Sequence, residues 1–460
     1  MDQQTFEKHQ RGIEPAGGRM EYPTISVIVL NYNGLRYMQD CFASLSQLDY
    51  PSDRVELVLA DNASTDGSVD YVREHFPQVR IMQFDKNYGI SITLNRATEQ
   101  VGSEYVAFLN SDMKVRPHWL TGLVEALDDE PGVVCSSSKI LNWDGNLMDF
   151  GGTIMRFTGQ GRANGYHDPD LTAYDDLRYI LAPCSGAMLI ERQTFLDVGA
   201  FDENFSIYFD DIDLGWRLWI LGYKVVYAPG SLCNHVHFGT LSQQPPARIT
   251  YLYERNALFT IIKNYEQQYL DRVLPAALWL QLKRSYLLAE MAGVDMEKSR
   301  FRLKAVDPPP SPGPVYDGRY YLKEAWQTLR SKGVGQLIDK IRAELARRSG
   351  QPLPIFGLGA KRTLEHPQFL TSQAHLAAAN DVIARLPAIY EQRALIQAKR
   401  QRTDRAIFET VRALSFDTHL KDTEFRDAQA HLVQALGLQE LFGDLFNSDI
   451  PFRYHFEEPT

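Results

Sequence analysis

Short apolar runs alternate with amphipathic stretches along the first half of the chain. The runs Ile25–Leu30, Val55–Ala60 and Glu104–Leu109 are each followed by a polar cluster. Near-continuous apolarity in a short run is typical of a strand that is buried on both faces. The pattern therefore predicts a βαβ arrangement, in which helices cover both faces of a mainly parallel sheet.

Weaker signals extend this pattern to about residue 230. The segment 132–174 is rich in Gly, Asn and Asp, which predicts short strands and loops laid over the sheet. The other predicted strands are Val79–Gln83, Gly186–Glu191 and Lys224–Ala228. Two predicted helices follow the first two strands and end near Gln47 and Phe76, and two more span Ile90–Gln100 and Asp210–Leu221.

Three parts follow from these signals: a polar extension at 1–22, an α/β domain at 23–265 and a mainly α-helical region at 266–460. The Pro-rich segment 307–314 is either a stiff linker or a loop over the first domain, and composition does not choose between them. Helices are predicted over Leu270–Met291, Leu322–Arg330, Val334–Arg348, Gln373–Arg385, Ala388–Leu414 and Asp427–Leu436, the last stopped by Gly437.

The net charge of the chain indicates which kinds of binding partner are expected. The 460 residues carry a net charge of -10, which argues against a nucleic-acid partner, because phosphate backbones require a basic face. The charge is uneven, with 21 basic and 35 acidic residues in 1–270 and 27 and 23 in 271–460. Four scattered cysteines and the lack of an apolar run of about 18 residues predict a cytoplasmic protein whose membrane contact, if any, is peripheral.

Polar clusters follow three of the predicted strands. In an open α/β sheet, ligands bind beyond the carboxyl ends of the strands, so Asn31–Gly34, Asp61–Asp66 and Asn110–Asp112 are expected to converge. The glycine-rich phosphate loops G-x-G-x-x-G and G-K-[ST] are absent after the first strand. If a diphosphate binds here, a divalent cation such as Mg²⁺ or Mn²⁺ held by Asp112 is the natural counter-charge.

Each of these acids also has a plain structural interpretation. The segment around Asp112 could be an Asx turn, and Asp61 could cap a helix instead of offering an acceptor to a nucleotide base. We expect Asp66 to cap the helix that starts near Gly67.

A second acidic cluster contains Asp210, Asp211 and Asp213. Carboxylates at a helix start gain from the helix dipole, so capping is one interpretation, and Asp213 is spaced to pair with Arg217. Crowding of Asp210 and Asp211 would raise the proton affinity of one of them, as suits a general base. Further on, His235 and His237 share one face of an extended segment and are candidate metal ligands.

Together these segments resemble the family 2 glycosyltransferases of the GT-A fold, particularly bacterial rhamnosyltransferases and related polysaccharide enzymes. The resemblance covers residues 24–265. It rests on SVIVLNYNG (26–34), ADNASTDGS (60–68), KNYG (86–89) with Asn95, LNSD (109–112), SGAMLIER (185–192), VGAFDENFSIYFDDIDLGWRL (198–218), GYKVVYAPG (222–230) and His235.

The resemblance implies inverting transfer of a sugar from a UDP- or dTDP-sugar, with dTDP-rhamnose as one candidate, to a glycan or lipid-linked acceptor of the bacterial surface. Asp211 would deprotonate the acceptor, supported by Asp210 and Asp213, while Asp112 and His235 (with His237 as a further candidate) would bind Mg²⁺ or Mn²⁺. Donor binding is expected from Asn31, Asn33, Asp61, Asn62, Asn87, Asn95, Asn110 and Ser111, and acceptor-side contacts from Ser185 and Gly186.

Two departures from the family pattern are visible. Asn110 replaces the first acid of the metal motif, and Ile90–Leu94 replaces a glycine-rich stretch beside the donor. The helical region contains no motif that indicates a function. Its segment 281–350 holds 14 basic and 8 acidic residues. This balance is compatible with solvated helices, with contacts in an oligomer, with a lid over the acceptor site or with docking on an anionic membrane. The rival hypothesis is a non-catalytic nucleotide-sugar-binding scaffold with a helical interaction tail.

Overall fold

The computed structural model describes residues 22–127, 130–236, 245–293, 367–412, 414–415 and 423–442. Several predicted features lie outside these residues: His237, the Pro-rich segment 307–314, the helices predicted over Leu322–Arg330 and Val334–Arg348, and nearly all of the extension 1–22.

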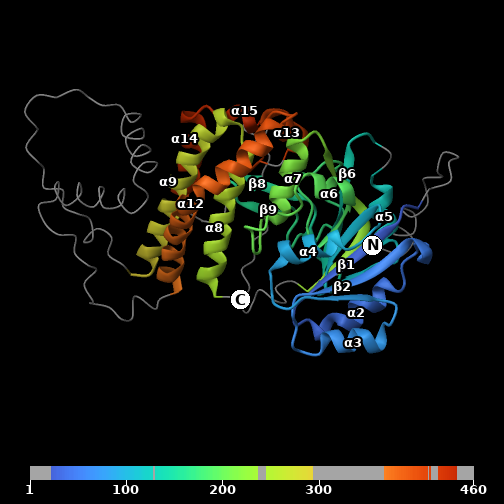
Figure 1. The fold of residues 1–460 in the computed structure, drawn as a ribbon. Coiled ribbons are helices and arrows are strands. Elements are labelled where there is room, and N and C mark those ends of the chain that lie inside the picture. Colours follow the sequence, from blue (N-terminus) through green and yellow to red (C-terminus); the bar gives the residue numbers. More distant parts are fainter. Residues whose placement is uncertain are drawn as a thin grey trace, which may run out of the picture.

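A nine-stranded mixed sheet forms the centre of the molecule (Figure 1). The strand order is β3-β2-β1-β4-β10-β6-β11-β5, and β7 pairs with β6 outside this path. The strands are β1 (Ile25–Asn31), β2 (Val55–Asp61), β3 (Arg80–Gln83), β4 (Tyr105–Asn110), β5 (Met113–Val115), β6 (Val133–Asn142), β7 (Met148–Phe150), β10 (Ala187–Glu191) and β11 (Lys224–His235).

The four strands β3, β2, β1 and β4 are mutually parallel, whereas β10 runs antiparallel to both β4 and β6. The register pairs Asn31 with Asp61, and Leu30 with Asn110, at the carboxyl ends of their strands. The polar clusters that follow β1, β2 and β4 therefore leave the sheet at one edge, as the sequence predicts.

Helices cover both faces of the sheet. Successive residues of a strand point to opposite faces, and accordingly Val27 and Val29 pack with α2, α3 and α5 while Ile28 packs with α4, α6 and α7. These helices are α2 (Leu35–Leu45), α3 (Ser68–His75), α4 (Ile90–Glu99), α5 (Trp119–Glu125), α6 (Arg192–Asp197) and α7 (Asp210–Ile220).

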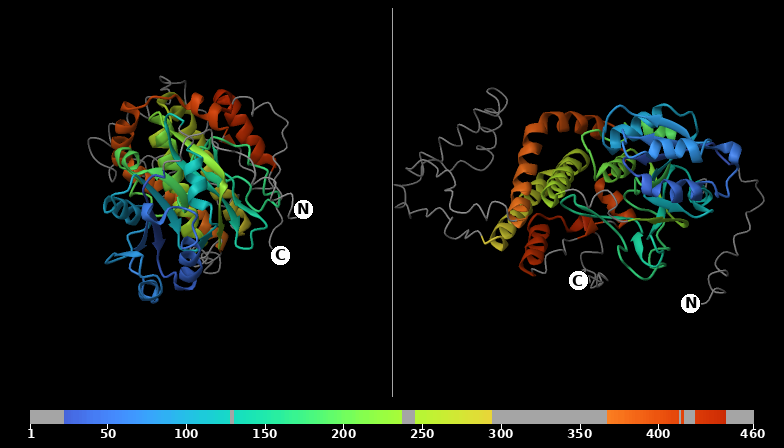
Figure 2. Two further views of the ribbon diagram at one scale, coloured as in Figure 1. Left: turned by 90° about the vertical axis from the view of Figure 1, so that its right-hand side faces the viewer. Right: turned by 90° about the horizontal axis from the view of Figure 1, so that it is seen from below.

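The C-terminal part of the described chain is helical and lies at the end of the molecule away from α2 and α3 (Figures 1 and 2). Its helices are α8 (Pro246–Asn264), α9 (Gln267–Met291), α12 (Pro367–Ala398), α13 (Asp404–Val411), α14 (Thr423–Ala435) and α15 (Gln439–Phe442). A small second sheet joins β12 (Leu414–Ser415) to β8 (Thr153–Arg156) and β9 (Gly161–Ala163).

One prediction for this region is wrong. Separate helices were expected over Gln373–Arg385 and Ala388–Leu414, but α12 runs unbroken through Pro387 to Ala398, and α13 is a distinct helix. Pro387 is exposed, so the helix tolerates the missing N–H on its outer side. The expected stop after α14 is confirmed, because Gly437 adopts the left-handed φ of 62°.

The hydrophobic core is continuous from the sheet into these helices. Trp216 of α7 lies with its ring centroid 4.7 Å from that of Tyr265 and 5.4 Å from that of Phe408 on α13. The domain boundary predicted at residue 265 falls in the short connection between α8 and α9, inside this shared core.

The predicted fold class, an α/β mixed sheet with helices on both faces followed by a mainly helical region, is thus confirmed. Within the described residues, no helix combines the length and the apolar character needed to cross a membrane.

Candidate functional site

The loops that follow β1 and β2 are joined by a buried polar network. The side-chain amide of Asn31 donates to Asp61 Oδ1 at 2.9 Å, to Ser64 Oγ at 3.0 Å and to Ser68 Oγ at 2.8 Å. The second oxygen of Asp61 accepts from the backbone N–H of Ser64 at 3.0 Å. Asp61 is fully buried, so its contact with a nucleotide base would require one of these partners to move.

Asn33 and Asp66 tie the same two loops together at the surface. Asn33 accepts from the backbone N–H of Thr65 at 2.8 Å, and its own N–H donates to Ser64. Asp66 accepts from the N–H of Leu35 at 2.8 Å and from that of Ser68 at 3.1 Å. Asp66 therefore holds the first residues of both α2 and α3, whereas the N-cap position of α3 is Gly67, which has no side-chain cap.

Asn62 and Asn87 connect the second loop to the third. The amide of Asn62 donates to Asn87 Oδ1 at 2.9 Å, and its oxygen accepts from the N–H of Tyr88 at 2.8 Å. These contacts place both predicted donor-binding residues beside the loop of Asp61.

The predicted metal motif, Asn110–Asp112, lies against these loops and also against the segment of Ser185 and Gly186, the residues predicted on the acceptor side. A methyl group at Gly34 would lie 2.9 Å from Ser111 Oγ, and one at Gly186 would lie 2.7 Å from Asn110 Nδ2. The backbone N–H of Asn110 also donates to the carbonyl of Gly186 at 2.9 Å. Residues from four separate sequence segments therefore meet in this part of the molecule.

Asp112 and His235 face one another at the end of β11. Nε2 of His235 lies 3.6 Å from Oδ1 of Asp112, and its Nδ1 is hydrogen-bonded at 2.6 Å to Asp149 on β7. Burial alone would lower the pKa of His235, but the carboxylates of Asp112 and Asp149 raise it to about 9. Positive charge is thus favoured between these side chains.

Asp112 and His235 fit the divalent cation that the resemblance to family 2 glycosyltransferases implies. The carboxylate of Asp112 suits Mg²⁺ or Mn²⁺, whereas the imidazole of His235 favours Mn²⁺, a transition metal, over Mg²⁺. A metal-binding histidine usually has its other nitrogen held by an acceptor such as Asp149. Within the described residues, no group of three or more His, Cys, Asp or Glu side chains is arranged to hold a metal ion. The pair Asp112 and His235 would therefore need phosphate oxygens to complete the coordination.

The second acidic cluster begins α7. Asp210 is buried and Asp211 is partly exposed; Oδ2 of Asp211 accepts from the N–H of Ser185 at 3.5 Å. Burial raises the pKa of Asp211 to about 7, with a further contribution from the Asp210 charge. Burial also raises the pKa of Asp210, and its Oδ2 has no hydrogen-bond partner in the described part of the chain. The pair therefore readily holds one proton near neutral pH.

The backbone that presents this pair is strained. Tyr208 and Phe209 have φ of 65° and 70°, in the left-handed region that favours glycine. Such a conformation costs about 1–3 kcal/mol per residue and persists only where surrounding contacts enforce it.

Asp213 lies in the first turn of α7, where its contacts help to hold the loop that precedes the helix. It is fully buried and binds Arg217 Nε at 2.8 Å, which confirms the predicted pair, and also Lys263 Nζ at 2.8 Å. Lys263 also binds Asp202 at 2.5 Å. Asn95 acts on the same loop, since its amide exchanges two hydrogen bonds with the backbone of Phe201. The side-chain N–H and the oxygen of Asn95 are thus both bound to the backbone of the protein, so this residue, predicted to bind the donor, has a structural role.

Sequence reasoning missed two residues that touch the site. Asp149 orients His235, and Asn256 on α8 binds the backbone that precedes Asp210. Neither follows a strand or belongs to a motif, and only their distant partners give them a role.

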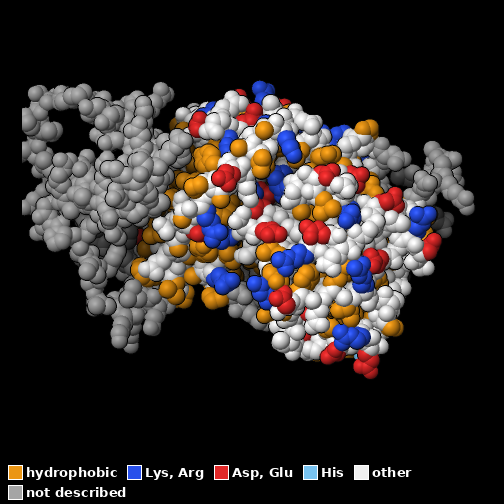
Figure 3. Space-filling view, viewed as in Figure 1, with side chains coloured by type: hydrophobic (Ala, Val, Ile, Leu, Met, Phe, Trp, Pro, Cys, Tyr) orange, Lys and Arg blue, Asp and Glu red, His pale blue; other side chains and the backbone are white. Residues whose placement is uncertain are grey.

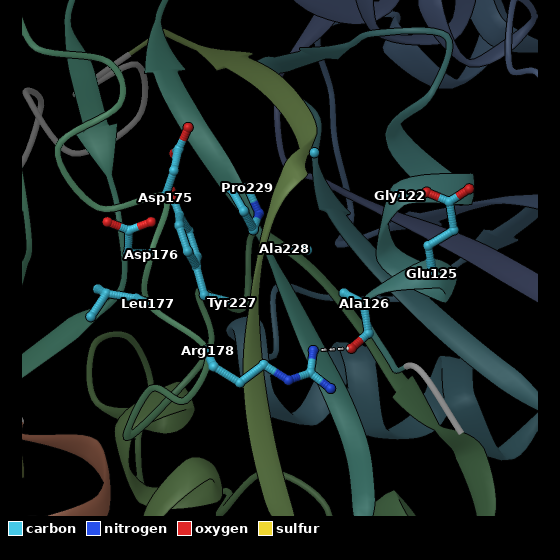
Figure 4. Close-up of a pocket in the computed structure, with 11 residues that line it drawn as sticks. Gly122, Glu125, Ala126, Asp175, Asp176, Leu177, Arg178, Tyr227, Ala228 and Pro229 are labelled. Carbon is cyan, nitrogen blue, oxygen red and sulfur yellow. Dashed lines mark hydrogen bonds between the residues drawn. The ribbon is translucent and has the colours of Figure 1, made fainter. Parts of the chain in front are cut away.

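A pocket of about 370 Å³ lies elsewhere, between the end of α5, residues 175–178 and β11 (Figure 4). Arg178 crosses it and donates to the carbonyl of Ala126 at 2.6 Å (Figure 4). None of the predicted site residues lines it, so we do not assign the predicted chemistry to this pocket.

Part of the sequence is similar to known glycosyltransferases. The family model described as "Glycosyl transferase family 2" matches residues 26–181. The chain is 26% identical over 264 residues to the N-acetylglucosaminyl-diphospho-decaprenol L-rhamnosyltransferase of Mycobacterium tuberculosis, over 51% of this chain and 83% of that protein. It is 29% identical to the glycosyltransferase AglE of Haloferax volcanii, over 45% of this chain and 64% of that one.

Among solved structures, the chain is similar to a mannosyltransferase from Pyrobaculum calidifontis in complex with GDP-Man and Mn²⁺. The TM-score is 0.44 at 16% identity, with 83% of this chain and 92% of that one covered.

Proposed function

We propose that the protein moves a sugar from a nucleotide-diphosphate donor to an acceptor hydroxyl with inversion at the anomeric carbon. The match of residues 26–181 to the family model "Glycosyl transferase family 2" supports the proposal. The donor is a UDP- or dTDP-sugar in this proposal, with dTDP-rhamnose as the first candidate because the Mycobacterium tuberculosis relative is named a rhamnosyltransferase. The acceptor is a bacterial glycan or its lipid-linked precursor.

Asp211 is the general base of the proposed reaction. The acceptor hydroxyl transfers its proton to Asp211 as its oxygen forms the new bond to the anomeric carbon. The bond from that carbon to the diphosphate oxygen breaks, and the electron pair leaves with the nucleoside diphosphate. A single displacement of this kind inverts the configuration. The raised pKa of Asp211 supports the role, because a base with a pKa near 7 accepts a proton readily at neutral pH.

Asp112 and His235 are the residues that would hold a divalent cation next to the leaving diphosphate, with Asp149 orienting the imidazole. When bound, the cation would offset the negative charge that grows on the diphosphate. The remaining donor contacts are assigned to the loops of Asn31, Asn33, Asp61, Asn62, Asn87, Asn110 and Ser111, in which Asp61 shapes the base subsite through Asn31 and Ser64.

The helical end of the molecule is the proposed membrane-facing part. Figure 3 shows hydrophobic side chains over α9 and α12, and on α9 Trp279 is 46% and Leu282 is 52% exposed. Exposed apolar side chains of this kind favour peripheral contact with a membrane. We therefore propose a cytoplasmic enzyme that meets lipid-linked acceptors at the inner membrane face.

One observation carries the proposal. Ser185 contacts Asp211, and the adjoining Gly186 contacts Asn110 of the predicted metal motif. The proposed base and the proposed diphosphate site are thus joined through two consecutive residues, Ser185 and Gly186.

The test is release of nucleoside diphosphate from a panel of UDP-, dTDP- and GDP-sugars with Mn²⁺, with water or simple glycosides as acceptor. Thermal shift of the protein with each donor first identifies the ligand. Turnover with one donor, abolished in Asp211→Asn, supports the enzyme. Donor binding by calorimetry without any turnover would instead favour the scaffold hypothesis.

A further inference from the structure

We propose that Asn256 on α8 is a positioning residue, whose amide holds the backbone of residues 207–209 so that Asp211 faces the acceptor. The inference rests on the proposed function of Asp211 and names a residue outside the family match at 26–181. It also gives the helical part of the chain a direct task in the reaction.

The contacts are specific. Nδ2 of Asn256 donates to the carbonyl of Ile207 at 2.8 Å and to that of Tyr208 at 2.9 Å. The side chain is fully buried, so water does not compete for either carbonyl. Both amide hydrogens therefore bind the two residues that precede Phe209 and the acidic pair.

This is the stretch of backbone that most needs support. Tyr208 and Phe209 are consecutive residues with left-handed φ, and neither is a glycine. Phe209 is also the N-cap of α7, without a side-chain cap of its own. A change of φ at either residue would turn the first residues of the helix, which include Asp210 and Asp211. The two bonds from Asn256 oppose that change directly.

Asn256 is itself held from behind. Its oxygen accepts from Arg255 Nε at 2.9 Å, which fixes the orientation of the amide. Arg255 also donates to the carbonyl of Asn204 at 3.0 Å and lies 3.6 Å from Asp381 on α12. A chain of polar contacts thus runs from α12 through α8 to the loop before the proposed base.

The opposite side of the loop is anchored on α4. Ser91 donates to the carbonyl of Phe205 at 2.8 Å. The backbone N–H of Ile90 donates to the carbonyl of Ser206 at 3.4 Å. These bonds end two residues before Tyr208, so the last turn toward Asp211 depends on Asn256.

The first experiment compares Asn256→Ala and Asn256→Ser with Thr260→Val in the full chain. Thr260 is the matched control, because it is fully buried one turn further along α8 and its hydroxyl has no hydrogen-bond partner in the described residues. We expect kcat to fall about 10- to 100-fold in Asn256→Ala, less in Asn256→Ser with its single donor, and not at all in Thr260→Val. The KM for the donor should change less than about twofold.

The second experiment is a rescue. Glycine adopts a left-handed φ without a side-chain penalty, so Tyr208→Gly should make the loop less dependent on the amide. We expect Asn256→Ala/Tyr208→Gly to have a higher kcat than Asn256→Ala alone. A crystal structure of Asn256→Ala should show Tyr208 or Phe209 outside the left-handed region, which is a readout independent of activity.

A wild-type kcat in Asn256→Ala would overturn the inference. So would a parallel loss of kcat, donor affinity and Tm that Tyr208→Gly does not rescue. Neither outcome would contradict the proposed glycosyltransferase activity. Absence of turnover in the wild type and in Thr260→Val with every donor would overturn the proposed function, and the inference with it.

Discussion

Nδ1 of His235 lies 2.6 Å from Oδ2 of Asp149, across strands β11 and β7. The contact leaves Nε2 as the nitrogen that faces Asp112. An imidazole held in this way keeps one ring orientation, which favours binding of a cation through Nε2.

We therefore expect Asp149→Asn to weaken Mn²⁺ binding in the presence of nucleoside diphosphate by about 10- to 100-fold, as is usual when such an outer partner is lost. Calorimetric titration with Mn²⁺ measures this directly. The control is Asp144→Asn, because Asp144 is an exposed residue of the loop between β6 and β7. Equal Mn²⁺ affinity in the two variants would count against the assigned site.

Replacement of the proposed base gives a second prediction. Asp211→Asn should reduce kcat by about 100-fold or more, because the amide cannot take the acceptor proton, while donor affinity stays within about threefold. Turnover and calorimetry with the same donor separate the two effects. Asp197→Asn, at the exposed end of α6, should behave as wild type. Full turnover in Asp211→Asn would remove Asp211 from the mechanism.

The pH dependence of the rate follows from the environment of Asp211. Burial, aided by the Asp210 charge, raises the pKa of Asp211 to about 7, and a base acts only when it is ionised. We expect kcat to rise about tenfold per pH unit below neutrality and to level off above about pH 8. A profile that stays flat down to about pH 5 would contradict the assignment.

Stability should change in the opposite sense. The pKa of Asp211 is higher in the folded chain than in the unfolded chain, so its contribution to stability weakens as the pH rises from about 4 through 7. Asp211→Asn cannot ionise, and its Tm should exceed that of the wild type at about pH 8 by more than it does at about pH 5. Thermal scans at both values measure the difference.

The buried charges near α7 predict a large stability effect. Lys263 is 2% exposed and lies 2.5 Å from Asp202 and 2.8 Å from Asp213. Lys263→Met would leave the buried Asp202 without its cation and Asp213 with Arg217 as its remaining cation. Loss of a buried cation typically costs about 3–5 kcal/mol in the free energy of unfolding. Urea titration measures it, with the exposed Lys399→Met expected to change stability by less than about 0.5 kcal/mol.

The defect of Lys263→Met should shrink in acid. Burial would raise the pKa of Asp202, but Lys263 holds it well below its usual range, so in the wild type this contribution to stability is lost only at very low pH. Without Lys263, the carboxylate protonates more easily and its burial costs less. A defect of equal size at about pH 4 and pH 8 would argue against this explanation.

The sheet was predictable because its strands are local patterns. The apolar runs that form β1, β2 and β4 end where their polar clusters begin, and parallel strands bring those clusters to one edge. The pairing of Asp213 with Arg217 was predictable for the same reason, since residues four apart on a helix are neighbours.

The residues that the sequence did not indicate depend on distant partners. Asp149 meets His235 across 86 positions, and Asn256 meets Ile207 across 49. No periodicity or spacing carries such information, because the partners are joined only by the way the chain folds back. Pro387 shows the converse, since a local rule predicted a break where α12 continues.

The packing of Trp216 between Tyr265 and Phe408 has a practical consequence. A fragment cut at residue 265, where the family resemblance ends, would lose Phe408 and expose the side of Trp216 on α7 that packs against it. Because α7 begins with the proposed base, such a truncation would lose its catalytic geometry together with its solubility. The sheet and the C-terminal helices are therefore expected to melt as one cooperative unit in calorimetry.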